Sequence, residues 1–256
     1  MGKRRLGQHF LYDLNILKKI IEHAKLTPDD TVVEIGPGHG SLTSLLLQHC
    51  KRVIAIEIDP VLCGKLKQRF VNAVNLELLN ADALVFDYGS LGRFKVVANL
   101  PYYITTPLLF RLLSFRAHLE AMVLMVQKEV ALRIASACGS KTYGVLSVMV
   151  QYVTKPNIEF IVGKGSFNPP PKVDSALVSF EIFENPRILV DDEALFFRII
   201  RTSFSKRRKT LANSLKSLNA LAADLLIKAG IDPKRRPETL SLEEFAAITR
   251  ALHQYH

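Results

Sequence analysis

The residues best suited to chemistry in this sequence follow an apolar run and read Asn99-Leu100-Pro101-Tyr102. The run, Phe94 to Ala98, is typical of a buried strand, and the strand must end by Leu100 because Pro101 cannot donate to a strand ladder. Asn99 and Tyr102 then lie at the carboxyl end of a strand, where open α/β sheets bind ligands. An amide oxygen can accept from the amino group of a planar base while an aromatic ring stacks on it. The alternative is an ordinary turn.

A glycine-rich loop follows an earlier β-branched stretch and opens a predicted helix. Thr31–Ile35 has the composition of a short strand, Gly36-Pro37-Gly38-His39-Gly40 comes next, and residues 41–48 show helical spacing of leucines. Strand, glycine loop and helix form the nucleotide-binding entry of a doubly wound sheet. Gly36 and Gly38 allow a tight turn and a close approach of ligand to backbone. The spacing is Gly-x-Gly-x-Gly rather than GxGxxG, so dinucleotide-dependent reduction is the weaker interpretation.

Two acids follow the next two predicted strands. Glu57 comes after residues 52–56, roughly twenty residues past the glycines, where an acidic side chain can accept from both hydroxyls of a ribose. Asp82 comes after residues 75–79 and could accept from an adenine amino group. The alternatives are a surface acid for Glu57 and a capping role for Asp82.

The remaining pattern continues the α/β alternation up to a proline-rich loop. Helices are expected over residues 13–25, 106–113, 127–138 and 144–152, and strands over 119–126 and 176–183. Pro169–Pro171 stiffen the loop before the last strand, which suggests a terminal antiparallel hairpin. Phe167 precedes the prolines and is a candidate exposed aromatic that could cover a base. Hydrophobic anchoring of the loop is the alternative role.

A linker at residues 184–187 leads into a wholly helical pattern. Helices are expected over residues 194–203, 211–218, 220–229 and 241–252, the last opening with a capping box of Ser241 and Glu244. We therefore expect a Rossmann-like domain at residues 1–186, with a mostly parallel sheet and a terminal antiparallel strand. Residues 187–256 are expected to form a small helical domain.

Composition indicates a globular protein with a polyanionic partner. Hydrophobic residues make up 48% of the 256 positions, which is ample for a packed core. The net charge of +10 suggests a nucleic acid, although a merely basic soluble protein would carry it too. The basic residues gather in three islands, each of which could instead be a solvated surface: Lys3–Arg5, Lys206–Lys209 and Lys234–Arg236.

Other sequence features argue against membranes, secretion and metals. No apolar run approaches the ~18 residues that span a bilayer, and no apolar segment follows the basic N-terminus as a signal peptide requires. The cysteines Cys50, Cys63 and Cys138 are scattered and form no CxxC. We therefore expect a cytoplasmic protein without a metal site.

Six motifs in this chain resemble, in order and spacing, those of the rRNA adenine N6-dimethyltransferases. They are Gly7–Leu11, Glu34–Gly38, Glu57–Asp59, Asn80–Ala83, Asn99–Tyr102 and Phe167–Ser175. The chain is most similar to the bacterial KsgA/RsmA type, because Phe204–Leu211 and Arg236–Ser241 resemble the C-terminal signatures of that group. The resemblance covers nearly the whole chain. One departure is His9, where many members carry Asn.

The resemblance implies a class I methyltransferase fold that uses S-adenosylmethionine, with a small all-α C-terminal domain. The implied reaction transfers four methyl groups to the N6 amines of two adjacent adenosines in the 3′-terminal hairpin loop of 16S rRNA, in the small ribosomal subunit or its precursor. We expect a monomer. The implied catalytic residues are Asn99, Leu100, Pro101, Tyr102 and Phe167. The implied cofactor-binding residues are His9, Leu11, Gly36, Gly38, Glu57, Asp82 and Asn99. The residues expected to bind RNA are Lys3, Arg4, Arg5, Arg201, Lys206, Arg207, Arg208 and Lys209.

Three other functions remain open at this point. A 23S rRNA adenine methyltransferase that confers macrolide resistance shares the core motifs but has different C-terminal signatures. A non-catalytic RNA-binding assembly or transcription factor could use the same fold, although the intact Asn99-Leu100-Pro101-Tyr102 argues against lost catalysis. DNA adenine methylation is the weakest of the three, since the chain has no separate target-recognition domain.

Overall fold

The structure, a computed structural model, describes residues 9–206 and 209–253. Its internal contacts divide the chain into two compact units. The first unit comprises the described residues up to Ala131 together with Lys155–Glu184, and the second comprises Leu132–Thr154 and the described residues from Asn185 onward. The expected domain boundary after residue 186 stays a prediction. In this division the expected helix at residues 144–152 belongs with the C-terminal helices.

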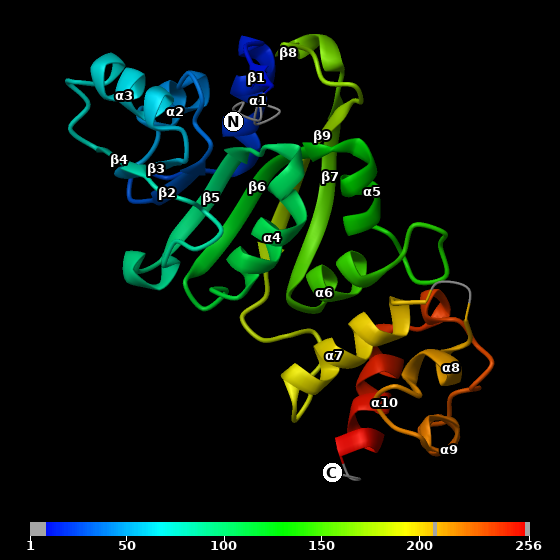
Figure 1. The fold of residues 1–256 in the computed structure, drawn as a ribbon. Coiled ribbons are helices and arrows are strands. Elements are labelled where there is room, and N and C mark those ends of the chain that lie inside the picture. Colours follow the sequence, from blue (N-terminus) through cyan, green and yellow to red (C-terminus); the bar gives the residue numbers. More distant parts are fainter. Residues whose placement is uncertain (1–8, 207–208, 254–256) are drawn as a thin grey trace, which may run out of the picture. The chain divides into compact units, whose positions relative to one another are not determined.

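A seven-stranded sheet with the order β4-β3-β2-β5-β6-β9-β7 forms the centre of the first unit (Figure 1). Neighbouring strands from β4 to β6 are parallel, and β9 runs antiparallel to β6. The sheet is therefore mostly parallel with an antiparallel strand near its end, as expected. The strands are β2 (Thr31–Ile35), β3 (Arg52–Glu57), β4 (Leu76–Asn80), β5 (Phe94–Asn99), β6 (Leu119–Gln127), β7 (Thr154–Val162) and β9 (Ser175–Ile182).

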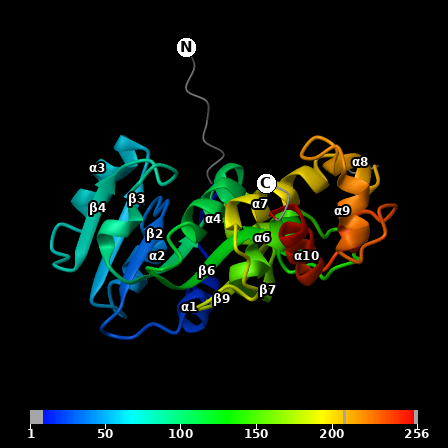
Figure 2. The ribbon, with the colours of Figure 1, turned by 90° about the horizontal axis from the view of Figure 1, so that it is seen from below.

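Helices precede, connect and follow the parallel strands of the first unit. Figure 2 shows α1 and α4 on opposite sides of β6. Asp13 caps α1 by accepting from the backbone N–H groups of Asn15 and Ile16, as its position in the sequence predicts. The helices are α1 (Leu14–Ala24), α2 (Ser41–Leu46), α3 (Pro60–Arg69), α4 (Thr105–Leu113) and α5 (Lys128–Ile134), with short 3₁₀ turns at Tyr88–Leu91, Tyr102–Ile104 and Lys164–Ser166.

The described part of the second unit is helical. The predicted capping box is present: Ser241 Oγ accepts from the Glu244 N–H, and Glu244 Oε2 accepts from the Ser241 N–H. Such reciprocal bonds satisfy two backbone donors that a helix start would leave unpaired. The helices are α6 (Val145–Val153), α7 (Glu193–Phe204), α8 (Leu211–Leu215), α9 (Ala222–Lys228) and α10 (Leu242–His253), with a 3₁₀ turn at Pro237–Thr239.

A separate two-stranded sheet joins the start of the described chain to the proline-rich loop. Strand β1 (Phe10–Leu11) pairs antiparallel with β8 (Phe167–Asn168), and Leu11 lies opposite Phe167. In Figure 1 these two short strands lie together near one end of β9. The sequence does not predict this pairing, because two-residue strands carry no hydrophobic periodicity.

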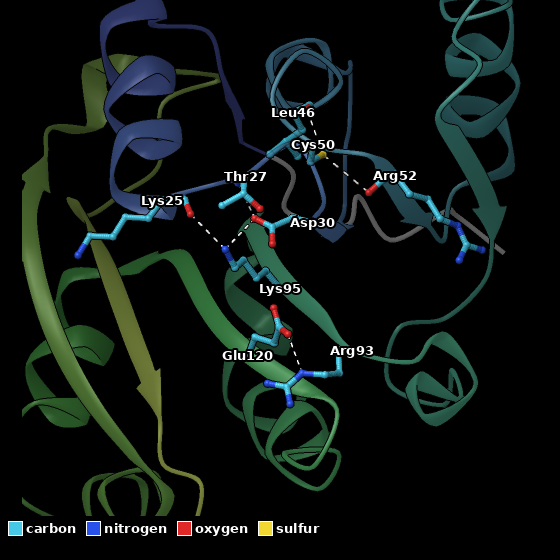
Figure 3. Close-up of polar contacts among 9 residues, drawn as sticks. All are labelled: Lys25, Thr27, Asp30, Leu46, Cys50, Arg52, Arg93, Lys95 and Glu120. Carbon is cyan, nitrogen blue, oxygen red and sulfur yellow. Dashed lines mark hydrogen bonds and ion pairs between the residues drawn. The ribbon is translucent and has the colours of Figure 1, made fainter.

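A partly buried ion pair lies at the amino end of the central strands. Lys95 Nζ donates to Asp30 Oδ2 at 2.7 Å and to the Lys25 carbonyl at 3.1 Å (Figure 3). Asp30 Oδ2 also accepts from the Thr27 N–H at 2.7 Å. Nearby, Arg93 Nε donates to Glu120 at 2.6 Å. These contacts lie at the amino end of β5, away from the carboxyl end where its Asn99 lies.

Neither a membrane-spanning helix nor a metal-binding cluster is present in the described part of the chain. Among the described residues, no helix combines the length and apolar character that crossing a bilayer requires. Over residues 9–206 and 209–253, no cluster of His, Cys, Asp and Glu has the arrangement of a metal site. Cys50, Cys63 and Cys138 are free thiols.

Candidate active site

A pocket opens in the first unit at the carboxyl ends of the parallel strands, with an empty volume of about 1140 Å³ that includes open solvent. Ten of the predicted site residues line the pocket. They are His9, Leu11, Gly36, Gly38, Glu57, Asp82, Asn99, Leu100, Pro101 and Tyr102.

The glycine loop forms one wall of the pocket. Gly36 and Gly38 have φ angles of +69° and +59°, which glycine adopts without steric cost. A Cβ at Gly38 would lie 2.8 Å from the ring of Phe10, so an alanine there would displace that ring. The ring of Phe10 in turn lies 4.1 Å from the ring of His39, measured between centroids. At Gly36 and Gly38 the loop therefore has backbone without side chains at the pocket, and Phe10 of strand β1 packs against Gly38.

Glu57 is buried at the end of β3 and held by two backbone amides. Its Oε1 accepts from the Asp59 N–H at 2.9 Å and its Oε2 from the Gly38 N–H at 3.3 Å. Burial raises the pKa of Glu57, while these two hydrogen bonds oppose the rise. Each carboxylate oxygen has a second lone pair, so the fixed side chain can still accept from a pair of ligand hydroxyls.

Asp82 lines the pocket and also caps the turn that follows β4. Its Oδ1 accepts from the Leu84 N–H at 2.8 Å, which is the capping role considered as the alternative. The capping contact uses one oxygen and does not exclude a ligand contact by the other.

Asn99 and Tyr102 are held from two directions. Asn99 Nδ2 donates to the His9 carbonyl at 3.2 Å. The Tyr102 hydroxyl shares a 2.6 Å hydrogen bond with Ser175 Oγ, and its ring lies 5.6 Å from the His9 ring. Leu100 is buried and its N–H donates to the Met125 carbonyl at 3.2 Å. The strand end thus presents an amide and an aromatic ring side by side in the pocket.

The expected exposure of Phe167 is wrong. Only 2% of this residue is exposed, and it packs in a core cluster with Leu11 and Leu177. The antiparallel pairing with β1 turns the side chain inward. Its burial supports the alternative role, hydrophobic anchoring of the proline-rich loop.

The expected RNA-binding residues divide between described and undescribed positions. Arg201, at the end of α7, is exposed, as are Lys206 and Lys209. Lys3, Arg4, Arg5, Arg207 and Arg208 lie outside the described residues. In the third basic island, Arg235 is bound to Glu244 and Thr239, so this member of the island stabilises the helical unit.

Glu34 and Tyr103 are among the pocket residues that were not predicted as site residues. Glu34, at 2% exposure, accepts from Thr43 Oγ1, and burial raises its pKa to about 8. Tyr103 lines the pocket and is 54% exposed. Burial, followed by the charges of Asp82 and Glu57, raises the pKa of Tyr103. Its position directly after Tyr102 was the one available sequence signal.

The pocket fits S-adenosylmethionine on the chemistry of its walls. That cofactor carries an adenosine and an amino acid but no phosphate, and the loop lacks the GxGxxG spacing for a pyrophosphate. Glu57 offers a fixed acceptor for ribose hydroxyls, and Gly36 and Gly38 line the pocket with backbone that carries no side chain. Fold and pocket together define a class I methyltransferase.

Comparison with known proteins agrees with this class. The family model described as ribosomal RNA adenine dimethylase matches residues 1–254, and the chain belongs to this family. The small-subunit methyltransferase named Ribosomal RNA small subunit methyltransferase A from Moorella thermoacetica is 45% identical, over 98% of this chain and 92% of the relative. A crystal structure of a dimethyladenosine transferase from Plasmodium falciparum superposes with a TM-score of 0.83 at 31% identity, over 96% of this chain and 98% of that one. The crystal structure of the 23S rRNA methyltransferase ErmE superposes with a TM-score of 0.73 at 26% identity, over 96% of this chain and 100% of that one.

Family membership confirms three of the sequence-based expectations. The fold class is that of a class I methyltransferase, the protein is an rRNA adenine dimethyltransferase, and S-adenosylmethionine is the methyl donor. Ribosomal RNA is therefore the substrate class.

Proposed function

We propose that this protein dimethylates the N6 amines of two adjacent adenosines in the 3′-terminal hairpin loop of 16S rRNA. It acts as a monomer in the cytoplasm, on the small ribosomal subunit or its precursor. Similarity to a small-subunit methyltransferase supports this choice over the large-subunit alternative, whose solved example is less similar in sequence. The observation that carries the proposal is the amide of Asn99 in the pocket, with its nitrogen engaged and its oxygen left for a substrate amine.

The chemical problem is the weak nucleophilicity of the adenine amine, whose lone pair is delocalised into the ring. The bound cofactor supplies a methyl group on a positively charged sulfur. Asn99 Oδ1 and the Leu100 carbonyl accept the two N6 hydrogens, which favours a pyramidal nitrogen with a localised lone pair. These acceptors position the amine and stabilise the positive charge that develops on it.

Tyr102 holds the face of the adenine once the base has left its RNA loop. Burial raises the pKa of Tyr102, with the Ser175 hydrogen bond opposing the rise. The phenol is therefore neutral at physiological pH and stacks as an uncharged ring. The product ammonium loses its proton to water, so no general base is needed. Contact of Phe167 with the base remains a prediction, and its burial favours the anchoring role.

On the cofactor side, Glu57 binds the ribose hydroxyls and Asp82 the adenine amino group. Gly36 and Gly38 admit the methionine portion, and Leu11 and the backbone of His9 close over it. In the second unit, exposed Arg201, Lys206 and Lys209 bind RNA phosphates, which predicts binding that weakens as salt rises. The same role for Lys3, Arg4, Arg5, Arg207 and Arg208 stays a prediction.

Transfer of tritiated methyl groups from S-adenosylmethionine tests the proposal. The acceptors are small ribosomal subunits from a strain that lacks this methylation, with large-subunit rRNA in parallel. Mass spectrometry of the digested RNA should find N6,N6-dimethyladenosine in the small subunit alone. Label in large-subunit RNA would instead indicate the resistance-type activity, and RNA binding without label would indicate a non-catalytic factor.

In this assay the variant Asn99→Ala tests whether the Asn99 amide is needed for methyl transfer. Loss of one preorganised partner of the reacting group slows enzymes by about 10²–10³-fold, and we expect a loss of at least that order. Asn15→Ala, on the exposed face of α1, removes the same side chain away from the pocket and should leave the rate unchanged. A near-normal rate in Asn99→Ala would show that its amide does not hold the amine.

A further inference from the structure

His9 contacts three groups at the pocket: the Asn99 amide, the Tyr102 ring and the Pro169 carbonyl. Its carbonyl accepts from Asn99 Nδ2 at 3.2 Å. Its ring lies against the Tyr102 ring, with centroids 5.6 Å apart and planes inclined by 32°. Its Nδ1 lies 2.8 Å from the Pro169 carbonyl, and because a carbonyl only accepts, Nδ1 carries the proton and donates. His9 thus links Asn99 and Tyr102, the two residues proposed to hold the target adenosine, to the proline-rich loop.

The carbonyl of His9 decides how the Asn99 amide is oriented. A side-chain amide has a donor end and an acceptor end of similar shape, so either could face a neighbour. Turning the amide over would place Oδ1 against the His9 carbonyl oxygen, and the two acceptors would repel. The observed contact keeps Nδ2 on the His9 side and leaves Oδ1 available to accept from a substrate amine.

The ring of Tyr102 is held between two contacts. Its hydroxyl is bound to Ser175 Oγ at 2.6 Å, and Ser175 is fully buried at the start of β9. The His9 ring contacts the aromatic ring of Tyr102. Stacking needs a ring in a fixed plane, and these two contacts restrict its plane.

His9 is in turn fixed by the loop on which it rests. Strands β1 and β8 pair directly after it, with Phe10 opposite Asn168. Tyr12 extends the attachment, since its N–H donates to the Ser166 carbonyl at 3.3 Å and its hydroxyl to the Gly165 carbonyl at 2.7 Å. The position of the His9 carbonyl therefore depends on the proline-rich loop.

We propose that His9 is a positioning residue for the target adenosine, acting through Asn99 and Tyr102. This inference rests on the proposed function, in which those two residues hold the base. It adds to the cofactor-binding role that the family resemblance implies for His9, which its backbone can fill, because the contacts of its side chain are with Tyr102 and Pro169. Loss of the side chain should then impair methyl transfer at saturating cofactor and leave cofactor affinity nearly unchanged.

Three substitutions separate the contacts of the side chain. His9→Ala removes the ring and the donor. His9→Asn keeps a donor at the position of Nδ1 without a ring, and His9→Phe keeps a ring without a donor. His49→Ala is the matched control, because the exposed His49 makes the same kind of contact, Nδ1 to the Leu45 carbonyl at 2.8 Å, at the end of α2.

The first measurement pairs kcat at saturating S-adenosylmethionine and small subunits with the Kd of S-adenosylhomocysteine from calorimetry. For His9→Ala we expect kcat to fall at least tenfold and the Kd to change less than twofold. His9→Asn should recover most of kcat, since the bond to Pro169 fixes the arm, and His9→Phe should recover less. A tenfold weaker Kd with unchanged kcat would assign His9 to the cofactor, and no change in either, or equal loss of both, would also overturn the proposal.

The second measurement needs no RNA substrate, so it separates failure of this inference from failure of the proposed function. The side-chain amide protons of Asn99 can be identified by NMR as the pair that is lost in Asn99→Ala. The one that the His9 carbonyl holds should exchange slowly with water in the wild type and at least tenfold faster in His9→Ala. Unchanged exchange in His9→Ala would show that the side chain of His9 does not position Asn99.

Discussion

Thr43 Oγ1 donates at 2.6 Å to Oε2 of Glu34, which lines the pocket where β2 leads into the glycine loop. The two residues are 1% and 2% exposed. Burial raises the pKa of Glu34 to about 8, although the Thr43 hydrogen bond lowers it, and the charge of Glu57 adds to the rise. Near neutral pH Glu34 therefore carries a proton, whereas Glu57 accepts hydrogen bonds from two backbone amides.

The raised pKa of Glu34 makes the folded protein less stable as pH increases. Between the ordinary value of 4.5 and about 8, the folded chain keeps a proton that the unfolded chain has released. The free energy of unfolding then falls with a slope of up to about 1.4 kcal/mol per pH unit from this group. In Glu34→Gln this slope should disappear, so the stability of the variant relative to the wild type should rise from pH 5 to pH 8 in urea unfolding.

An exposed glutamate supplies the control for this measurement. Glu22 lies on the solvent-exposed face of α1, so Glu22→Gln should leave the pH dependence of unfolding as it is in the wild type. Parallel stability curves for Glu34→Gln and the wild type would mean that Glu34 titrates at its ordinary pKa.

Substitution of Gly38 should weaken cofactor binding through the backbone and through Phe10. The left-handed φ of +59° costs a residue with a Cβ about 1–2 kcal/mol, and the added Cβ would lie 2.8 Å from the Phe10 ring. We expect Gly38→Ala to lower the free energy of unfolding by at least this amount and to raise the Kd of S-adenosylhomocysteine. Gly64→Ala is the control, because no atom lies within 4 Å of the new Cβ in α3 and alanine favours helix. An unchanged Kd in Gly38→Ala would mean that the loop absorbs the methyl group.

Sequence reasoning predicts well which residues lie at the carboxyl ends of the strands. Asn99, Glu57 and Asp82 each follow an apolar run, and the carboxyl ends of parallel strands meet at one edge of a sheet. All three line the same pocket. The N-cap Asp13 and the capping box at Ser241 were equally predictable, since each depends on bonds within a few residues.

Contacts between distant short segments escape such reasoning. The pairing of Phe10–Leu11 with Phe167–Asn168 spans most of the chain and involves two residues on each side, so it has no periodicity to detect. That pairing buries Phe167, which the sequence suggested was exposed. The raised pKa of Glu34 was also beyond sequence reasoning, because it depends on how far packing excludes water.

Glu57 should be the side chain on which cofactor affinity depends most. Hydrogen bonds to a charged partner contribute roughly 1.5–3 kcal/mol each. Glu57→Gln keeps one acceptor oxygen but turns a donor toward backbone amides that already donate. We expect calorimetry to give a Kd for S-adenosylhomocysteine at least tenfold weaker in Glu57→Gln. Glu77→Gln on β4, where the glutamate is exposed and paired with Arg52, should not change it. Equal affinities in the two variants would contradict the ribose-binding role.

The ion pair of Asp30 with Lys95 should stabilise the fold, and its contribution should depend on acid pH. Both side chains are nearly buried, at 10% and 16% exposure. Burial alone would raise the pKa of Asp30, but the hydrogen bonds from Lys95 and Thr27 and the lysine charge lower it overall. A lowered carboxyl pKa stabilises the folded chain above the ordinary value of 3.8, and this stabilisation is lost as pH falls through the folded value.

Lys95→Met leaves Asp30 without its cation in a site that excludes most water (Figure 3). Breaking a fully buried pair from one side typically costs about 3–5 kcal/mol. This pair is only partly buried, so we expect a loss of about 1–3 kcal/mol at pH 7 in urea unfolding, between the values for exposed and buried pairs. Asp30→Asn in the same chain should restore part of this loss, because the unpaired charge is then gone. Arg93→Met is the control: Arg93 and Glu120 are 75% and 31% exposed, and such pairs contribute about 1 kcal/mol or less. If both single variants lost the same small amount, the Asp30 pair would behave as a surface contact, and the amino end of β5 would owe its stability to apolar packing alone.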